Sequence, residues 1–111
     1  MTDRPWPQTL RFKAGRKCLE IDFESGETFA IPYELLRVES PSAEVQGHHP
    51  SQKQIVRGKS DIGINAAEPV GRYAVRLVFS DGHNSGIYSW DYLYELGAEA
   101  DDRMAAYRAS L

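Results

Sequence analysis

The chain has 111 residues and a mass of 12.5 kDa, a size that fits one domain with a thin core. Its hydrophobic and charged fractions, 41% and 26%, are those of an ordinary globular protein, and no apolar run approaches the about 20 residues of a membrane span. The net charge of −3 argues against nonspecific nucleic-acid binding. A single cysteine excludes an internal disulfide, and the N-terminus lacks the apolar segment of a signal peptide, so we expect a cytoplasmic protein.

The first third of the chain predicts an arm, three strands and a short helix. Residues 1–8 hold two prolines and are expected to form an extended arm, with Trp6 packed onto a sheet. Alternating apolar residues predict strands over 9–13, 17–23 and 28–31. Pro32 ends the third strand because it cannot donate to a strand ladder, and Tyr33–Val38 suits one or two helical turns. Four basic residues near the first turn are interpreted as the solvent-facing side chains of a hairpin: Arg11, Lys13, Arg16 and Lys17.

Residues 39–60 hold few apolar side chains. Glu39–Lys53 has almost nothing to bury, and a loop of about 15 residues inside a compact domain indicates either a function or disorder. Alternatively, Ser40 caps a short helix with Glu44 in its first turn. The sequence is compatible with the loop and with the short helix.

The remaining chain predicts further strands and two helices. Ile62 and Ile64 alternate before Ala66–Gly71 interrupts the pattern. The clearest strand is Tyr73–Phe79, with its aromatic and aliphatic residues on one face. After a turn at Ser80–His83, the chain returns as a strand over Ser85–Tyr88.

Two helices are expected to end the chain. Ser89 is a good N-cap for a helix over Trp90–Leu96, and Gly97 is expected to end it. A second helix is predicted over 98–111, where Met104, Tyr107 and Leu111 follow at helical spacing.

An internal repeat links the two halves at an offset of 56 residues, because Phe23–Leu36 resembles Phe79–Leu93. Each copy predicts a strand, a glycine turn, a short strand and a helical turn. We therefore predict an α+β fold: a mostly antiparallel sheet from two strand–strand–helix units, with short helices and a C-terminal helix. The expected domain covers residues 9–97, between the N-terminal arm and the C-terminal helix.

The candidate chemistry is limited. His48 and His49 point to opposite sides of an extended segment, and His83 is expected to stay solvated in its turn. A metal site that joins His83 to His48 or His49 and an acid such as Asp81 is one hypothesis; surface or structurally bonded imidazoles are the other. Cys18 has no neighbouring base, and the serines lack a nucleophile elbow. We therefore do not expect an enzyme.

Two motifs carry a resemblance to a known family. Leu36–Val45, followed by Phe79–Ser85 and Trp90–Leu93, resembles the small N-terminal domain of gamma-butyrobetaine hydroxylases, in its stand-alone bacterial version of unknown function. The resemblance covers roughly residues 9–97. It implies a structural zinc site with three cysteines and one histidine. Those positions fall here on Ser40, Ser42, Val45 and His83. Because serine is a poor substitute for thiolate and valine cannot ligate, we expect no zinc and no other cofactor.

The resemblance also bears on function. In the hydroxylases, iron and 2-oxoglutarate chemistry resides in a second, larger domain, so no oxygenase activity is expected here. Similar domains are attached to P-loop ATPases of the iron–sulfur carrier type, which suggests a partner-binding or assembly role.

We expect a noncatalytic interaction or accessory domain that binds a protein partner, and neither nucleic acid nor membrane. Its recognition surface would combine the Ser40–Pro50 loop with the His83 turn. The residues expected to bind the partner are Ser40, Ser42, Glu44, His48 and His83. The alternative is a metal-binding or metal-delivery domain that uses His83 with His48 or His49, linked to iron–sulfur or iron-enzyme maturation.

Overall fold

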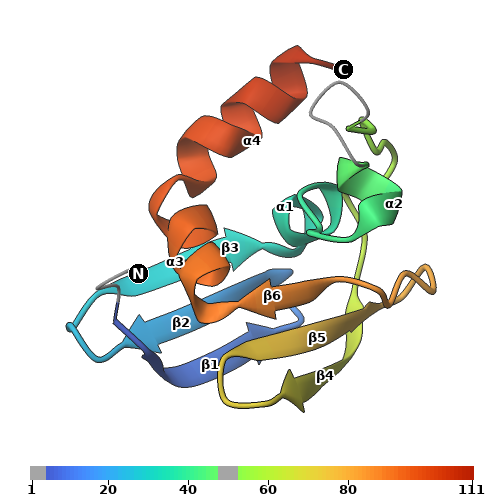
Figure 1. Ribbon diagram of the computed structural model, residues 1–111. Coiled ribbons are helices and arrows are strands. Elements are labelled where there is room, and N and C mark those ends of the chain that lie inside the picture. Colours follow the sequence, from blue (N-terminus) through green and yellow to red (C-terminus); the bar gives the residue numbers. More distant parts are fainter. Residues whose placement is uncertain (1–4, 48–52) are drawn as a thin grey trace.

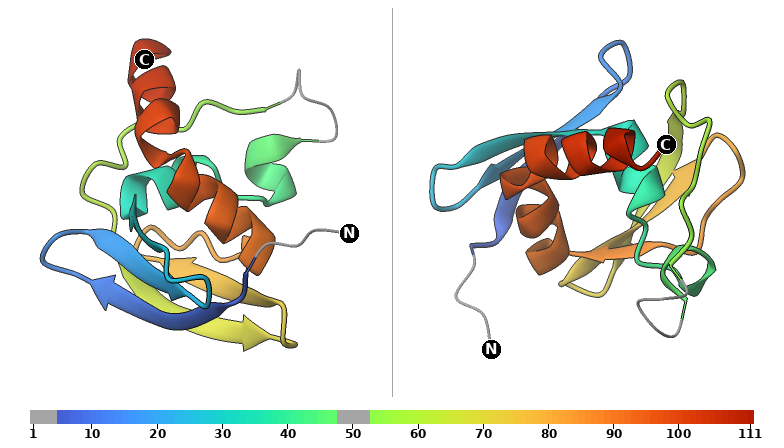
Figure 2. Two further views of the ribbon diagram at one scale, coloured as in Figure 1. Left: turned by 90° about the vertical axis from the view of Figure 1, so that its left-hand side faces the viewer. Right: turned by 90° about the horizontal axis from the view of Figure 1, so that it is seen from above.

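The computed structural model describes residues 5–47 and 53–111, which form two antiparallel three-stranded sheets and four helices (Figure 1). This confirms the predicted α+β class. The helices lie on one side of the sheets (Figures 1 and 2). The first sheet contains β1 (Pro7–Lys13), β2 (Cys18–Phe23) and β3 (Thr28–Pro32), and the second β4 (Ile64–Val70), β5 (Ala74–Phe79) and β6 (Ile87–Ser89). The helices are α1 (Tyr33–Val38), α2 (Ala43–Gln46), α3 (Trp90–Ala98) and α4 (Ala100–Ala109).

Each half of the chain contains three strands before its helix, one more than in the predicted strand–strand–helix unit, although the three strands of the first half were each expected. In the second half the unexpected strand is β4, which covers the segment Ala66–Gly71 that was expected to interrupt the pattern. Pro69 is tolerated there because β4 is an edge strand that pairs only with β5 among the described strands. A register shift between Ile64 and Ala66 further obscures the alternation in the sequence.

The repeat is visible in the hydrogen bonds of the two glycine turns. Gly26 and Gly82 adopt φ angles of 92° and 91°, the left-handed region that favours glycine. Their N–H groups donate to the carbonyl oxygens of Phe23 and Phe79 over 2.9 and 3.0 Å. In return, the N–H of Phe79 donates to the carbonyl of His83 over 2.9 Å. The second turn thereby fixes the backbone of His83.

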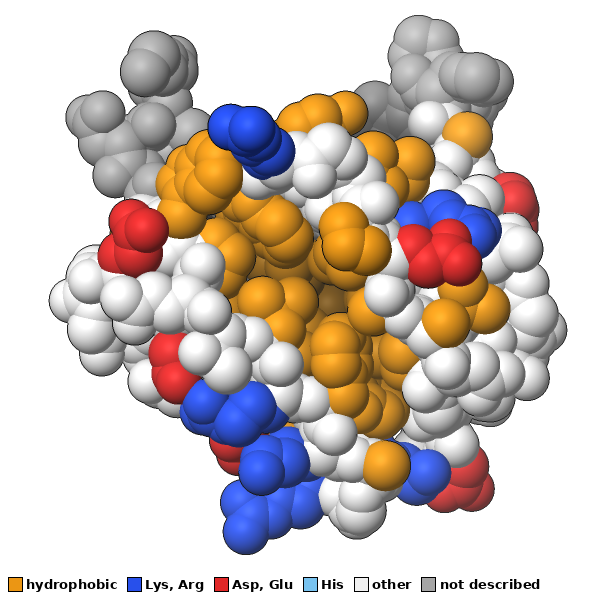
Figure 3. All heavy atoms as spheres, turned by 90° about the horizontal axis from the view of Figure 1, so that it is seen from below, with side chains coloured by type: hydrophobic (Ala, Val, Ile, Leu, Met, Phe, Trp, Pro, Cys, Tyr) orange, Lys and Arg blue, Asp and Glu red, His pale blue; other side chains and the backbone are white. Residues whose placement is uncertain are grey.

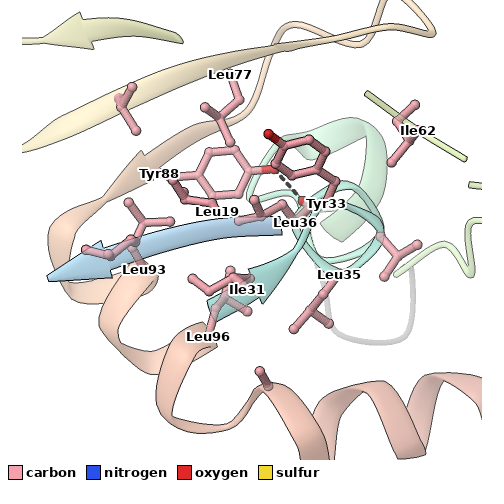
Figure 4. Packing of buried hydrophobic residues seen from close by; sticks show 14 of the residues in the cluster. Leu19, Ile31, Tyr33, Leu35, Leu36, Ile62, Leu77, Tyr88, Leu93 and Leu96 are labelled. Carbon is pink, nitrogen blue, oxygen red and sulfur yellow. Dashed lines mark hydrogen bonds between the residues drawn. The ribbon is translucent and has the colours of Figure 1, made fainter. Parts of the chain in front are cut away.

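The core lies between the sheets and the helices. Leu19, Ile31 and Leu77 come from the sheets and pack against leucines of α1 and α3 (Figure 4). Tyr88 of β6 lies among them, and its hydroxyl donates a hydrogen bond to the carbonyl oxygen of Leu36. Burial of these side chains is the main driving force for bringing the two repeats together.

Several boundaries differ from the expectation. β1 begins at Pro7, two residues before the expected start at residue 9. Trp6 is 51% exposed and is not packed onto the sheet, and Tyr73 lies outside β5 and is also exposed. Gly97 lies within α3, and a Cβ there would come within 2.6 Å of the Phe29 Cβ. The glycine allows α3 to approach β3 closely and does not end the helix.

The helix starts follow the sequence more closely. The Ser89 Oγ accepts a hydrogen bond from the N–H of Tyr92 over 3.1 Å, which confirms the expected N-cap. The C-terminal helix begins at Ala100, after a break at Glu99. Within the described part of the chain, no helix combines the length and the apolar character needed to cross a bilayer.

Candidate functional site

The buried polar residues Ser40, Ser42 and His83 form a polar cluster with the exposed Glu44 at its border. The imidazole of His83 is only 7% exposed, so the expectation that it stays solvated was wrong. Its Nε2 lies 2.9 Å from the Oγ of Ser40 and 3.3 Å from the Oγ of Ser42. The cluster thus joins the β5–β6 turn to the segment between α1 and α2.

That segment is better packed than its sequence suggests. Ser40 and Ser42 are buried, and so is Val45, although the stretch was expected to bury almost nothing. The alternative with a short helix is confirmed in α2, but Ser42 and not Ser40 occupies its N-cap position. The Ser42 side chain makes no capping bond, because its hydroxyl turns toward the imidazole instead.

The imidazole is held in its neutral form. Burial and the positive charge of Arg37 lower the pKa of His83 from its ordinary value, against the opposing effects of Glu44 and Asp81. Its Nδ1 lies 3.3 Å from the Oε2 of Glu44. A carboxylate only accepts, so Nδ1 carries the proton and Nε2 accepts from the serine hydroxyls.

Asp81 holds the turn from the other side. One of its carboxylate oxygens accepts a hydrogen bond from the backbone N–H of His83 over 3.0 Å. The other lies 2.8 Å from the Nε of Arg37 and 2.7 Å from the Nζ of Lys59. Burial disfavours the charged carboxylate, but these three donors outweigh it and hold the pKa of Asp81 well below its usual range.

The order Glu44–His83–Ser40 is that of a Ser-His-acid triad. Ser40, however, has no exposed surface. Its Oγ also lies 3.4 Å from the N–H of Ser42, which donates to it. A substrate carbonyl therefore has no path to this hydroxyl, and the contacts act to hold two segments together.

The donor set does not fit the zinc site that the resemblance implies. Ser40, Ser42 and His83 do converge, but two hydroxyls and one imidazole nitrogen are a poor set for zinc, and Val45 offers no donor atom. Among the described residues, no group of three or more His, Cys, Asp or Glu side chains could hold a metal ion. His48 and His49 lie outside the described residues, so a site that joins either of them to His83 stays a prediction.

The predicted partner-binding role of this region also stays a prediction. Ser40, Ser42 and His83 are buried and do not reach the surface, and His48 is not described. Glu44 is exposed, and its Oε1 accepts a hydrogen bond from the Oγ of Ser85 over 2.8 Å.

A second candidate lies at the end of the molecule turned away from the helices, where β1 and β4 are found (Figure 1). Strand register places Leu10 and Phe12 on the same face as the buried residues of β2, since Leu10 pairs with Ile21 and Phe12 with Leu19. In the other sheet the register places three β4 residues on the face of buried β5 residues: Ile64, Ala67 and Pro69. Leu10 and Ile64 pack against the core but are only half-buried, whereas the other three are exposed.

We call this set, Leu10, Phe12, Ile64, Ala67 and Pro69, the underside groove. Figure 3 shows this side of the molecule, where hydrophobic side chains form a hollowed surface across the centre. Lys and Arg side chains gather along its lower border in that view. The β1–β2 turn supplies exposed cations, Lys13, Arg16 and Lys17.

The underside groove is not predicted by the sequence. The alternation that predicts the strand over 9–13 places Leu10 and Phe12 on one face, and the register confirms this. Alternation reports the face on which a side chain lies, but not whether another element covers that face. The signal that was available is the apolar alternation of residues 9–13 beside the basic turn.

A third concavity, of about 410 Å³, lies between α4, the end of α1 and residues 53–56. Its charged side chains already pair with one another. The Nη1 of Arg103 lies 2.9 Å from the Oε2 of Glu39, whose other oxygen pairs with Lys53. The hydroxyl of Tyr107 donates to the carbonyl of Val56 over 2.7 Å. These contacts close α4 onto the domain and leave none of these polar groups directed at a ligand.

Comparisons with known proteins identify relatives. The family model described as gamma-butyrobetaine hydroxylase-like, N-terminal, matches residues 10–94. The crystal structure of a DUF971 family protein of unknown function from Acidithiobacillus ferrooxidans is 40% identical, with a TM-score of 0.73 over 89% of this chain and 100% of that one.

Two solution NMR structures are also similar. One is 42% identical, with a TM-score of 0.81 over 96% of this chain and 84% of that one. The other is 44% identical, with a TM-score of 0.78 over 99% of this chain and 87% of that one. No match was found among curated proteins.

Proposed function

Because the chain belongs to the gamma-butyrobetaine hydroxylase-like N-terminal family, we propose that it is a noncatalytic accessory domain that binds a protein partner through the underside groove. One observation carries this proposal: the apolar rows that form the core continue into side chains that are exposed to solvent. The core-facing rows of both sheets extend into β1 and β4, where Phe12, Ala67 and Pro69 are exposed. Contiguous exposed apolar surface of this kind marks interaction sites.

The polar cluster supports a noncatalytic role. The hydroxyl with triad-like partners, that of Ser40, is inaccessible, and the imidazole of His83 is already engaged on both nitrogens. A domain whose reactive groups are bonded to one another and whose apolar surface is open is suited to binding and not to chemistry.

Site-specific photocrosslinking in the native cells tests the proposal. A photoreactive amino acid at position 12 is expected to yield one discrete adduct with another protein after irradiation. The matched control places the same amino acid at Ile87, which is 46% exposed but pairs with Arg76 on the outer face of β5–β6. The adduct should be absent at position 87.

A second variant distinguishes binding through the underside groove from chance contacts at position 12. Leu10→Asp puts a charge into the underside groove and should abolish the adduct at position 12, provided that circular dichroism shows the variant to be folded. An adduct that persists in the folded Leu10→Asp protein, or that forms equally at position 87, would contradict binding through this groove.

A further inference from the structure

We propose that the partner segment is an extended strand that adds to the free edge of β1, with apolar side chains facing the underside groove and acidic residues beside the β1–β2 turn. This inference rests on the proposed function and names the chemistry of the partner. Three features of the described residues carry it: a free strand edge, an apolar row beside it, and a group of exposed cations that are at most weakly paired.

The free edge belongs to β1. Among the described strands β1 pairs only with β2, so its other edge presents backbone donors and acceptors to solvent. Its pairing with β2 is regular from Thr9 to Lys13, and the single register shift lies between Pro7 and Thr9. A strand of about five residues is therefore available for backbone pairing, the usual basis of recognition by strand addition.

The edge of β4 is less suitable. Pro69 has no N–H to donate, and the register shift between Ile64 and Ala66 interrupts the strand near its start. These features protect β4 against pairing with another chain. The groove-facing residues of β1 are Leu10 and Phe12, so no inward-pointing charge protects that edge.

The apolar row of Leu10 and Phe12 indicates which sequence pattern the partner strand should have. In an added strand every second side chain would face the groove, next to Leu10 and Phe12 and opposite β4. Phe12 is 37% exposed, and the exposed part of this residue can contact an apolar side chain of the partner. Alternating apolar residues in the partner would cover the opening that β1 and β4 leave.

The exposed cations near the β1–β2 turn indicate which charge the partner should carry. Arg11 is already neutralised, because its Nη1 lies 2.6 Å from the Oδ2 of Asp22. The side chain of Arg16 is 79% exposed and reaches the Oε2 of Glu20 only at 3.9 Å. Lys13 is exposed at the end of the free edge. An acidic residue of the partner would therefore find unneutralised positive charge at this end of the groove.

A second copy of the chain fits less well. β1, which would pair with its own copy, has the sequence Pro-Gln-Thr-Leu-Arg-Phe-Lys and contains no carboxylate. Pairing of two such strands would bring apolar residues together but would give Lys13 no acidic partner and Arg16 none besides the distant Glu20. A separate protein segment with acidic residues matches both features.

Titration with two synthetic peptides, followed by amide NMR shifts of the full chain, tests the proposal. Both peptides alternate valine and threonine over seven residues; one ends in two glutamates and the other in two lysines. The glutamate peptide should bind at least about fivefold more tightly, the factor expected for two exposed ion pairs. The shifts should be centred on the amides of Thr9–Lys13.

A charge-reversed protein provides the second arm. Lys13→Glu/Arg16→Glu should reverse the preference, so that the lysine peptide binds more tightly. The matched control, Arg72→Glu/Arg108→Glu, changes the net charge equally at exposed sites in the turn before β5 and at the end of α4. It should keep the preference of the unaltered chain.

Several results would overturn the strand-addition proposal: equal affinity for both peptides, no binding of either, or shifts outside β1. A chain that is dimeric by sedimentation and becomes monomeric on Phe12→Asp would also overturn it, in favour of a second copy. A specific photocrosslink at position 12 combined with any of the first three results would overturn strand addition alone. If one of those three results is found and no specific photocrosslink forms at position 12, the proposed function is overturned too.

Discussion

The polar cluster and the underside groove depart from the usual distribution of side chains in opposite ways. On one side of the domain, two serines and a histidine are buried and bonded to one another. On the other side, the apolar rows of the two sheets continue into side chains that remain open to solvent. Buried polar groups are costly unless they are paired, whereas exposed apolar groups contribute little stability to the isolated domain.

This contrast indicates which region can be altered without loss of the fold. Residues of the polar cluster have chemistry typical of functional sites, but their bonds are made within the domain. Residues of the underside groove have no reactive chemistry, but their contacts are incomplete. The two regions should therefore respond oppositely to mutation, the cluster in stability and the groove in binding.

The largest change in the free energy of unfolding is expected when one of two cross-strand neighbours, Leu19, is truncated and the other, Phe12, serves as the comparison. Leu19 is fully buried, whereas its partner Phe12 is 37% exposed. Leu19→Ala should lower the free energy of unfolding by about 3 kcal/mol, because it leaves a cavity in the core. Phe12→Ala should cost less, about 1–2 kcal/mol, because more than a third of that residue is already exposed to water. Equal losses in urea unfolding would show that the groove is not open in solution.

His83→Ala should lower the free energy of unfolding by about 2 kcal/mol. The substitution removes the acceptor of two buried serine hydroxyls and leaves them without this partner. Ser85→Ala is the matched control, because within the described part of the chain its hydroxyl bonds to the exposed Glu44 alone. That control should stay within about 0.5 kcal/mol. An unchanged melting temperature for His83→Ala would show that the cluster does not stabilise the domain.

Gly82→Val should cost more than about 1 kcal/mol, because residue 82 has a φ of 91° that β-branched residues rarely adopt. This change displaces the turn that carries His83 without removing any polar group. Gly15→Val is the control: Gly15 lies in another turn without a positive φ, and a Cβ there meets nothing within 4 Å. Thermal unfolding that is equally affected by both changes would contradict the strained backbone at Gly82.

The smallest effect is expected from metal removal. A chelator should leave the melting temperature unchanged, and elemental analysis should find no stoichiometric zinc, because Ser40, Ser42 and Val45 replace the thiolates that the family resemblance implies. The variant Ser40→Cys/Ser42→Cys/Val45→Cys is a positive control that should gain zinc. One tightly bound zinc in the unaltered chain, with unfolding on chelation, would reverse this conclusion.

Local patterns predicted much of the fold. The helix over Tyr33–Val38 has the expected bounds, because Pro32 precedes its first turn and its apolar residues face the core. The N-cap at Ser89 and the left-handed Gly82 follow equally from nearby residues. β4 was missed because its alanines and Pro69 resemble a loop, and only its pairing with β5 makes it a strand.

The candidate sites were less predictable because they depend on residues far apart in the chain. His83 was singled out from the sequence, but its burial depends on Ser40, 43 residues away, and on the packing of α2. The underside groove depends on how two sheets lie relative to each other. No periodicity in a single strand reports that arrangement.

The order of the strands also bears on how the chain folds. Each sheet is made from one continuous stretch, residues 7–32 or 64–89, and no strand of one sheet pairs with a strand of the other in the described part of the chain. All backbone ladders therefore close over short loops, which favours rapid formation of each meander. The two meanders can form independently, and their docking requires only that apolar side chains meet. Residues such as Leu19 and Leu77, which come from the two sheets and belong to one core cluster, would then acquire their contacts last.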